Sequence, residues 1–145
     1  MTDSNRKLCE KYPFLKINDL DGDPYAYTWL DDVPDGWRKA FVEQMCEEIK
    51  QALLEKGGEK SLHEYEIMQI KEKYGTLRWY DFNAPSKVQD IIDKYEDISA
   101  DICIKCGESA TVMTTGWIRP YCDECAKKLQ HRNFIPITKK ESRYA

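Results

Sequence analysis

Long apolar runs and secretion signals are missing from this 145-residue chain. No run approaches the roughly 20 apolar residues that span a bilayer, and the basic pair Arg6-Lys7 has no apolar signal core behind it. We therefore expect no membrane span and a cytoplasmic location. The 41% of hydrophobic and 12% of aromatic residues are too many for a disordered chain, whereas 33% of charged residues are too many for a membrane protein. The composition predicts a single soluble globular domain.

Histidines and known catalytic motifs are scarce as well. The only histidines are His63 and His131, and the chain has no nucleophile elbow, P-loop, dinucleotide fingerprint or His-Glu-x-x-His motif. A nuclease of the His-Asn-His type needs a catalytic histidine on its hairpin, and residues 107–121 contain none. Paired carboxylates such as Asp31-Asp32 more often face solvent than perform catalysis. We therefore expect that the protein is not an enzyme.

The charge is unevenly distributed along the chain. Residues 1–72 carry ten basic and sixteen acidic side chains, a balance of −6, whereas residues 73–145 carry twelve and ten, a balance of +2. The net charge of −4 argues against a general nucleic-acid binder. The acidic stretch is a solvated face, a docking surface for a basic partner or a cation site, but not an EF-hand, since Pro24 stands where that loop needs glycine. Its members are Asp19, Asp21, Asp23, Asp31, Asp32 and Asp35.

Four of the six cysteines follow the spacing C-x2-C-x15-C-x2-C, which is typical of a zinc site. A disulfide framework is the alternative, but it belongs to short secreted chains. Four thiolates close the coordination sphere, so we expect one structural Zn²⁺, with His131 as an alternative fourth ligand in place of Cys125. Cys46 lies on the apolar side of a predicted helix, and Cys9 has no neighbours that would lower its pKa. The predicted ligands are Cys103, Cys106, Cys122 and Cys125.

One long helix is predicted in the first half. Asp32 is a candidate cap, Pro34 suits the first turn, and Gly57-Gly58 ends the apolar repeat. The preceding residues, 8–30, show no sustained period and are expected to be loop with at most one short strand. The helix is amphipathic, and its apolar face is wide enough to pack on a sheet. Its stripe comprises Trp37, Phe41, Met45, Ile49 and Leu53.

The sheet is predicted in residues 64–82, where β-branched and aromatic residues flank Gly75 as two strands of a hairpin. A second amphipathic helix runs from near Pro85 through Ile98 and leads into Cys103. Helix, hairpin and helix followed by a cysteine element predict an α+β fold.

The cysteine element has its own predicted elements. Residues 110–114 and 117–121 read as a small hairpin, and residues 123–130 as a helix that opens at the second cysteine pair. Together with the first cysteine turn, they predict a treble clef or zinc ribbon. The expected organisation is a body over 1–100, a zinc element over 101–131 packed on the body, and a tail over 132–145.

Cations and aromatics alternate along the predicted hairpin, where Trp79 and Tyr80 follow Arg78. Such a mixture can stack bases and hold phosphates. The alternative is that Ile70, Leu77 and Trp79 are core and that the cations form the solvated face of an alternating sheet. The candidate nucleic-acid contacts are Lys71, Lys73, Arg78, Lys127 and Lys128.

Several motifs of the chain resemble a family of small phage and prophage proteins of unknown function. They are residues 70–80 (Ile-Lys-Glu-Lys-Tyr-Gly-Thr-Leu-Arg-Trp-Tyr), residues 103–107 (Cys-Ile-Lys-Cys-Gly) and residues 116–125 (Gly-Trp-Ile-Arg-Pro-Tyr-Cys-Asp-Glu-Cys). Asp35-Gly36-Trp37 and Tyr12-Pro13 are similar to the family too. Its members often carry histidine where this chain has Cys125. The resemblance implies a phage or mobile-element origin and a site inside the bacterial host cell.

Residues 103–129 are also similar to the four-cysteine finger of small regulators that bind RNA polymerase, although this chain has a short helix and a hairpin where those proteins have a coiled coil. These observations together predict a non-enzymatic, zinc-stabilised protein that binds a host protein or ribonucleoprotein. An inhibitor of host machinery or of host defence, of the anti-CRISPR kind, is the most specific form of this hypothesis. The alternative is a DNA- or RNA-binding accessory factor of a phage or prophage. No small-molecule substrate is expected.

Overall fold

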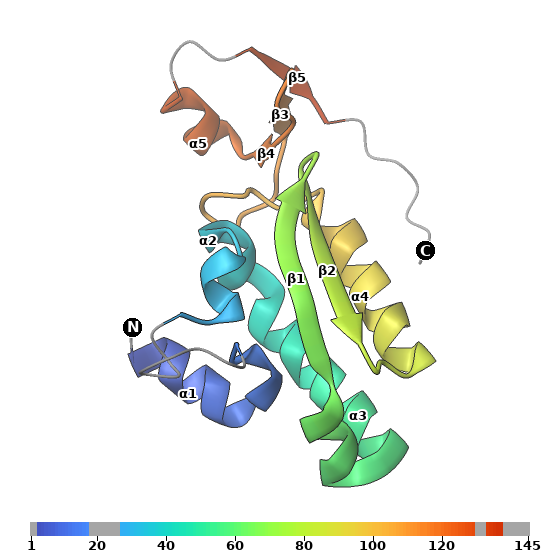
Figure 1. Cartoon of the computed structure of the whole chain (residues 1–145). Coiled ribbons are helices and arrows are strands. Elements are labelled where there is room, and N and C mark those ends of the chain that lie inside the picture. Colours follow the sequence, from blue (N-terminus) through green and yellow to red (C-terminus); the bar gives the residue numbers. More distant parts are fainter. Residues whose placement is uncertain (1–2, 18–26, 130–132, 138–145) are drawn as a thin grey trace.

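The computed structural model describes residues 3–17, 27–129 and 133–137, and its helices and strands form an α+β fold (Figure 1). The described residues form a two-stranded hairpin and a three-stranded antiparallel sheet, in addition to the helices. The α+β class predicted from the sequence is confirmed. Below, "body" means residues 3–17 and 27–100, and "C-terminal element" means residues 101–129 and 133–137.

The N-terminal segment is helical, which its sequence pattern does not predict. Helix α1 (Asp3–Lys11) and the short 3-10 helix η1 (Pro13–Leu15) replace much of the expected loop. The buried side chains of α1 include Asn5 and Cys9, one polar and one small, so the apolar periodicity is weak there. Tyr12, between the two helices, is fully buried. The segment has too few apolar residues for an apolar repeat to predict the helix.

The long helix predicted from the apolar stripe is confirmed, and all five residues of the stripe are buried. It consists of α2 (Asp35–Trp37), the π-helical segment η3 (Arg38–Val42) and α3 (Glu43–Glu64). The predicted end of the helical run at Gly57-Gly58 is confirmed, because both glycines have non-helical backbone angles, with φ values of −155° and 65°. A second helical segment follows this kink as far as Glu64, so that α3 consists of two segments.

The predicted cap of the long helix is wrong. Asp32 belongs to a separate 3-10 helix, η2 (Trp29–Asp32), whose N-cap is Thr28. The Thr28 hydroxyl accepts a hydrogen bond from the Leu30 N–H at 3.2 Å, and the Asp31 carboxylate accepts one from the Thr28 N–H at 2.7 Å. This capping box starts a helix several residues earlier than the apolar repeat does.

The predicted hairpin is confirmed as β1 (Glu66–Lys73) and β2 (Thr76–Phe82). Its turn, Tyr74-Gly75, has φ values of 53° and 80°, as the two-residue turn with positive φ at both positions requires. One face of the hairpin is buried and carries Ile70, Leu77 and Trp79. The alternating cations therefore lie on the opposite face, as the core interpretation of this segment predicts.

The second predicted helix is confirmed as α4 (Ser86–Ser99), and it covers the outer edge of β2. The Leu77 N–H donates to Ser99 Oγ at 2.8 Å, and the Trp79 N–H donates to Glu96 Oε2 at 2.8 Å. These bonds satisfy backbone groups that an edge strand would otherwise leave open.

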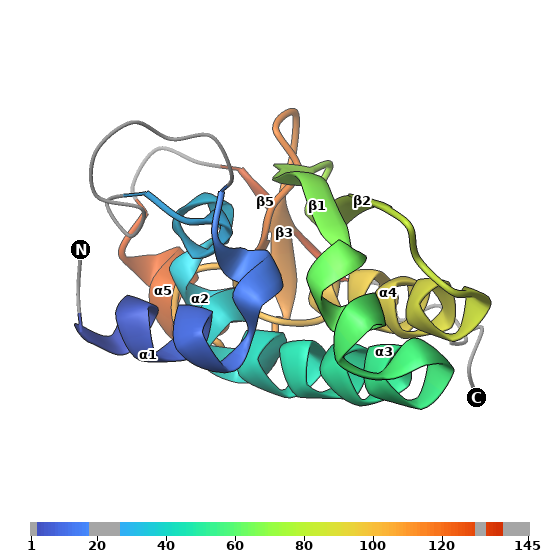
Figure 2. The ribbon, with the colours of Figure 1, turned by 60° about the horizontal axis from the view of Figure 1, so that its bottom comes forward.

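The helices of the body lie side by side, with α1 and α4 on opposite sides of α3 (Figures 1 and 2). The β1–β2 hairpin lies across α3 and α4, and its turn points toward the C-terminal element (Figure 1). Within the described ranges, no helix combines the length and the apolar character needed to cross a bilayer.

The C-terminal element contains the predicted hairpin as β3 (Val112–Thr114) and β4 (Pro120–Tyr121), followed by helix α5 (Asp123–Lys127). It also contains a strand that the sequence pattern does not predict. Strand β5 (Phe134–Pro136), which falls in the expected tail over 132–145, pairs with β3 and gives the order β4-β3-β5. Three residues are too few for a strand pattern to be recognisable.

Candidate metal centre

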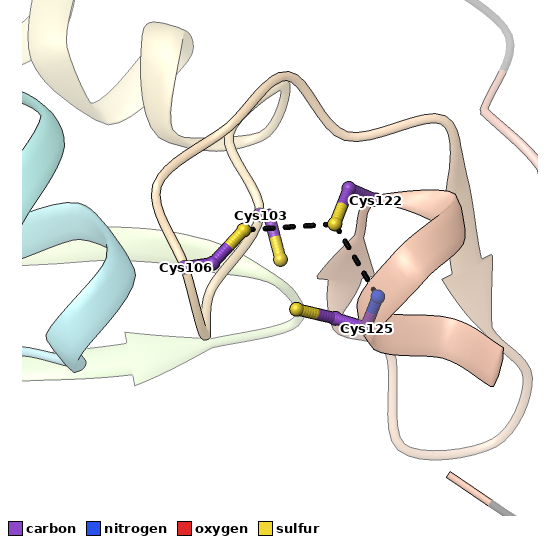
Figure 3. A group of neighbouring side chains, drawn as sticks. All are labelled: Cys103, Cys106, Cys122 and Cys125. Atoms are coloured by element: carbon purple, nitrogen blue, oxygen red, sulfur yellow. Dashed lines mark hydrogen bonds between the residues drawn. The ribbon is translucent and has the colours of Figure 1, made fainter. Parts of the chain in front are cut away.

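The four cysteines of the C-x2-C-x15-C-x2-C pattern come together in the C-terminal element (Figure 3). Cys103 and Cys106 lie on the turn between α4 and β3, Cys122 is the N-cap of α5, and Cys125 lies in the first turn of that helix. Three of the four are buried, and Cys106 is half-buried. The two C-x2-C pairs, which are distant in sequence, thus bring their sulfur atoms together around one common position.

The sulfur positions suit a tetrahedral metal site. The four Sγ atoms lie within 4.8 Å of one another, and Sγ of Cys106 is 3.5 Å from Sγ of Cys122. Metal–sulfur bonds of about 2.3 Å in a tetrahedron place the sulfurs about 3.8 Å apart. A disulfide needs about 2.05 Å, and all four cysteines are free. The arrangement is therefore one that can hold a metal ion.

The first cysteine turn is shaped by Gly107. Its φ of 87° lies in the left-handed region that glycine adopts without strain, and its N–H donates to the Cys103 carbonyl at 3.1 Å. The Cys103 N–H in turn donates to the Glu108 carbonyl at 2.7 Å. These bonds fold the backbone tightly enough for two thiols three residues apart to point the same way.

The second cysteine turn is set by the start of α5. Cys122 precedes the helix as its N-cap, and its Sγ accepts a hydrogen bond from the Cys125 N–H at 3.4 Å (Figure 3). Backbone N–H groups at a helix start favour a negatively charged sulfur. The same turn brings the Cys125 thiol beside the first pair.

The electrostatic surroundings of the thiols differ. Burial raises the pKa of Cys103, but hydrogen bonds from the backbone N–H groups of Cys122, Cys106 and Lys105 outweigh it and lower the pKa to about 7. Burial, followed by hydrogen bonds with the neighbouring thiols, raises the pKa of Cys125 to about 12. A coordinated metal deprotonates such a thiol, because the cation offsets the loss of hydration. The backbone N–H groups thus favour the thiolate at Cys103, whereas burial opposes it at Cys125.

The metal centre is joined to the body through α2. The Gly36 N–H donates to the Ile104 carbonyl at 2.9 Å, and the indole Nε1 of buried Trp37 donates to the Ile102 carbonyl at 3.1 Å. A Cβ on Gly36 would come within 2.1 Å of the Cys103 carbonyl oxygen. Only glycine permits this approach, so the first cysteine turn sits directly on the start of the long helix.

Glu72, to which the sequence pattern assigns no role, forms a second junction. One of its oxygens accepts from the Gly75 N–H at 3.1 Å, and the other accepts from Arg119 Nε at 3.0 Å and from Trp117 Nε1 at 3.4 Å. The Glu72 side chain is only 10% exposed. Its single carboxylate therefore links the turn of the β1–β2 hairpin to the β3–β4 loop.

The predicted acidic set is only partly described. Asp19, Asp21 and Asp23 lie outside the described residues. Asp31 takes part in the capping box of η2, and Asp32 accepts a hydrogen bond from the Tyr27 hydroxyl. Asp35 is exposed in the first turn of α2. The two aspartates Asp31 and Asp32 thus have structural partners.

The predicted basic set divides between two places. Lys71 pairs with Arg78 across the outer face of the hairpin, where Lys73 also lies. Lys127 and Lys128 are exposed at the end of α5, away from that hairpin in both ribbon views (Figures 1 and 2). The structure does not bring the five together. Trp79, proposed from the sequence as a stacking residue, is buried, and its indole Nε1 donates to the Tyr65 hydroxyl at 2.9 Å.

The remaining cysteines and histidines stand apart from the metal centre. Cys46 is fully buried as predicted, and burial raises its pKa. Cys9 is also fully buried, and burial raises its pKa to about 11. His63 is exposed on α3 and lies 3.5 Å from Glu59 Oε2 through its Nε2. His131, the alternative ligand, lies outside the described residues.

Among the residues that the structure describes, the four cysteines are the one set of three or more His, Cys, Asp or Glu side chains whose ligand atoms converge closely enough for a metal ion. Comparisons with protein-family models, with curated proteins and with solved structures gave no match.

Proposed function

We propose that the chain is a non-enzymatic binding protein whose C-terminal element is a treble clef held by one structural zinc ion. The convergence of four thiols within 4.8 Å carries this proposal. Four sulfur ligands are the donor set of structural zinc sites, and they leave no open position at which water or substrate is activated. Cysteine turn, β3–β4 hairpin and helix α5 follow one another as a treble clef requires.

The partner that we propose is a protein or ribonucleoprotein of a bacterial host cell, bound in its cytoplasm. The acidic first half of the chain and the resemblance to phage and prophage proteins support this. An acidic surface can occupy a basic channel that normally holds nucleic acid, and such binding weakens as salt screens the charges. Inhibition of host machinery, including a counter-defence role of the anti-CRISPR kind, is the specific form of this proposal.

The test is retention of a host partner. Zinc-loaded protein is immobilised at low salt, a bacterial lysate is passed over it before and after nuclease treatment, and retained molecules are identified by mass spectrometry. We expect a defined protein that survives nuclease and dissociates as salt rises. Retention that disappears completely with nuclease contradicts a protein partner.

The acidic surface is tested separately. Asp31 and Asp32 stay unchanged because of their structural bonds, and Asn replaces Asp19, Asp21, Asp23 and Asp35 together. We expect at least tenfold weaker binding to the retained protein. A control removes the same number of charges from exposed carboxylates elsewhere, and equal effects of the two variants contradict the acidic surface. The control replaces Glu55, Glu59, Glu64 and Asp90 by their amides.

A second candidate function is nucleic-acid binding, and the outer face of the β1–β2 hairpin favours it. Lys71 and Arg78 lie opposite each other there, and the Lys71 ammonium lies 5.7 Å from the ring centroid of exposed Tyr80. Replacing Lys71 and Lys73 by alanine is expected to lower the salt dependence of binding, by about 0.7 in log–log slope for each phosphate contact on a single strand. No retardation of any nucleic acid at low salt rules this candidate out.

A further inference from the structure

The ends of the two hairpins form a shared cleft. The turn of the β1–β2 hairpin meets the loop between β3 and β4, and side chains of both line a cavity of about 330 Å³. A Cβ on Gly75 would lie 3.2 Å from Ile118, so the two ends are in close contact. Figures 1 and 2 both show these ends side by side. The lining residues are Lys71, Glu72, Lys73, Tyr74, Gly116, Trp117 and Ile118.

Tyr74, at the turn, occupies a conformation that does not suit it. Its φ of 53° is unfavourable for a bulky side chain, and asparagine or glycine is the usual residue at this position of such a turn. The side chain is 68% exposed, so packing in the core does not compensate for the strain. Strained residues of this kind cluster at functional sites.

Trp117 stands on the other side of the cleft. Its side chain is 67% exposed, although tryptophan usually buries most of its surface. The hydrogen bond from its Nε1 to Glu72 uses only the edge of the indole. The guanidinium of Arg119 lies over the ring, 5.6 Å from its centroid. These two contacts orient the indole, and most of its surface stays exposed for a further contact.

The charges around the cleft are mainly positive. Lys71 and Lys73 line it directly, and the Lys73 ammonium lies 5.7 Å from the ring centroid of Tyr74. Glu72 is the one acidic residue of the lining, and its carboxylate is engaged by Arg119 and by the backbone of Gly75. An anionic ligand therefore meets the ammonium groups of Lys71 and Lys73 beside two exposed aromatic rings.

We propose that this cleft binds single-stranded nucleic acid, with bases stacked on Tyr74 and Trp117 and phosphates held by Lys71 and Lys73. This inference rests on the second candidate function and names its site. Aromatic rings stack on the unpaired bases of a single strand and have no such access in a duplex, while flanking cations follow the backbone. Neither Tyr74 nor Trp117 is among the candidate nucleic-acid contacts predicted from the sequence.

The test is fluorescence anisotropy of labelled 20-mers of deoxythymidine and of uridine, titrated with the zinc-loaded full chain at low salt, with a duplex of equal length for comparison. We expect the single strands to bind more tightly than the duplex. Removing one stacked base contact is expected to weaken binding about 5- to 150-fold. The two single strands also distinguish DNA from RNA as the ligand.

The variants are chosen so that misfolding does not imitate loss of binding. Tyr74→Asn suits the positive φ of the turn, so we expect weaker binding with unchanged or higher stability. Trp117→Ala is expected to weaken binding, and Trp117→Phe to restore most of it. Phe82→Ala, at 58% exposure on the same hairpin, is the control and is expected to bind as the unchanged chain does.

Each contrary result has a separate meaning. Absence of binding to either single strand overturns both this inference and nucleic-acid binding in general. Binding that Tyr74→Asn and Trp117→Ala leave intact overturns the cleft alone. Equal affinity for duplex overturns base stacking. The lysate experiment gives a further contrary result if the unchanged chain retains a host protein after nuclease treatment that Tyr74→Asn and Trp117→Ala do not retain. This result would make the cleft a protein-binding site and would also overturn the inference.

Discussion

The body and the C-terminal element are stabilised in different ways. Among the described residues, the largest fully buried side chains all belong to the body, from Tyr12 to Ile92. In the C-terminal element, Cys103, Cys122 and Cys125 are themselves among the few buried residues. A segment of fewer than about 40 residues rarely folds on apolar burial alone. Hydrophobic burial therefore stabilises the body more than the C-terminal element, whose buried residues lie at the margin of the same core, and we expect a metal ion at the four cysteines to supply most of the stability of that element.

Removal of the metal is the strongest test of this difference. Structural zinc binds zinc-finger peptides with an apparent free energy of about 10–16 kcal/mol, and this energy stabilises the folded state. Chelation is therefore expected to unfold residues 103–127 and leave the body folded. Hydrogen exchange with and without chelator measures this region by region. Loss of protection in α3 and β1 to the same extent would show that the two regions do not differ.

Metal stoichiometry gives the matched control. We expect one zinc ion per chain in the unchanged protein and in Cys9→Ala, since Cys9 lies in the body. Cys125→Ser is expected to lose most of the metal, because three thiolates remain. Equal metal content in Cys125→Ser and in the unchanged protein would point to another fourth ligand, such as His131.

Disturbing the core of the body is expected to have the next largest effect. Leu53 is fully buried on α3, and Leu53→Ala is expected to lower the free energy of unfolding by about 2–5 kcal/mol. Urea unfolding measures the loss. Metal content at 25 °C is expected to stay at one ion per chain, and its loss would contradict separate stabilisation of the two regions.

The sequence predicts best where one pattern determines one feature. The cysteine spacing identifies the four convergent thiols, and the stripe from Trp37 to Leu53 identifies the long helix. Prediction from the sequence fails where contacts between residues distant in the chain determine the secondary structure. Helix α1 buries Asn5 and Cys9, so no apolar repeat marks it, and β5 is short and depends on pairing with β3.

The site shows the same limit. Glu72 looks like an ordinary surface charge in the sequence, and only the fold brings Arg119 and Trp117 to it. Trp79 follows the cation Arg78 in the sequence and is a candidate for base stacking there, yet the sheet turns it inward. The sequence shows where charged and aromatic side chains alternate along a strand, whereas tertiary contacts determine which of these side chains are exposed to a ligand.

The junction between the regions is expected to contribute less than either of them. Glu72→Gln keeps one oxygen as an acceptor but removes the charge that pairs with Arg119, so we expect a loss of about 1 kcal/mol. Hydrogen exchange in residues 115–119 is the measurement, and about a fivefold increase is expected. Glu64→Gln is the control, because Glu64 pairs with Lys60 in an exposed helical position, and its effect is expected below about 0.5 kcal/mol. Equal effects of the two variants would mean that the regions are not coupled through Glu72.

Acidification is expected to act on Asp81 in the body and on the metal centre with opposite signs, and the effect at Asp81 is the smallest. Thiols must lose their protons to bind metal, so a falling pH is expected to destabilise the metal-bound C-terminal element. In the body, burial raises the pKa of Asp81, outweighing the hydrogen bond that its carboxylate accepts from the Tyr65 hydroxyl at 2.7 Å.

A raised pKa means that the folded body holds this proton more tightly than the unfolded chain. Ionisation of Asp81 therefore lowers stability as pH rises from about 4, the unfolded value, through the raised folded value. Asp81→Asn retains an acceptor for Tyr65 without the charge, so the variant is expected to gain less than about 1 kcal/mol over the unchanged chain near pH 7, an advantage that disappears near pH 3. Urea unfolding followed by the fluorescence of buried Trp79 measures this, with Asp90→Asn on the exposed side of α4 as the control. An advantage that instead grows as the pH falls would mean that hydrogen bonding to the carboxylate, and not its burial, dominates at Asp81, and Asp81 would then respond to acid with the same sign as the metal centre.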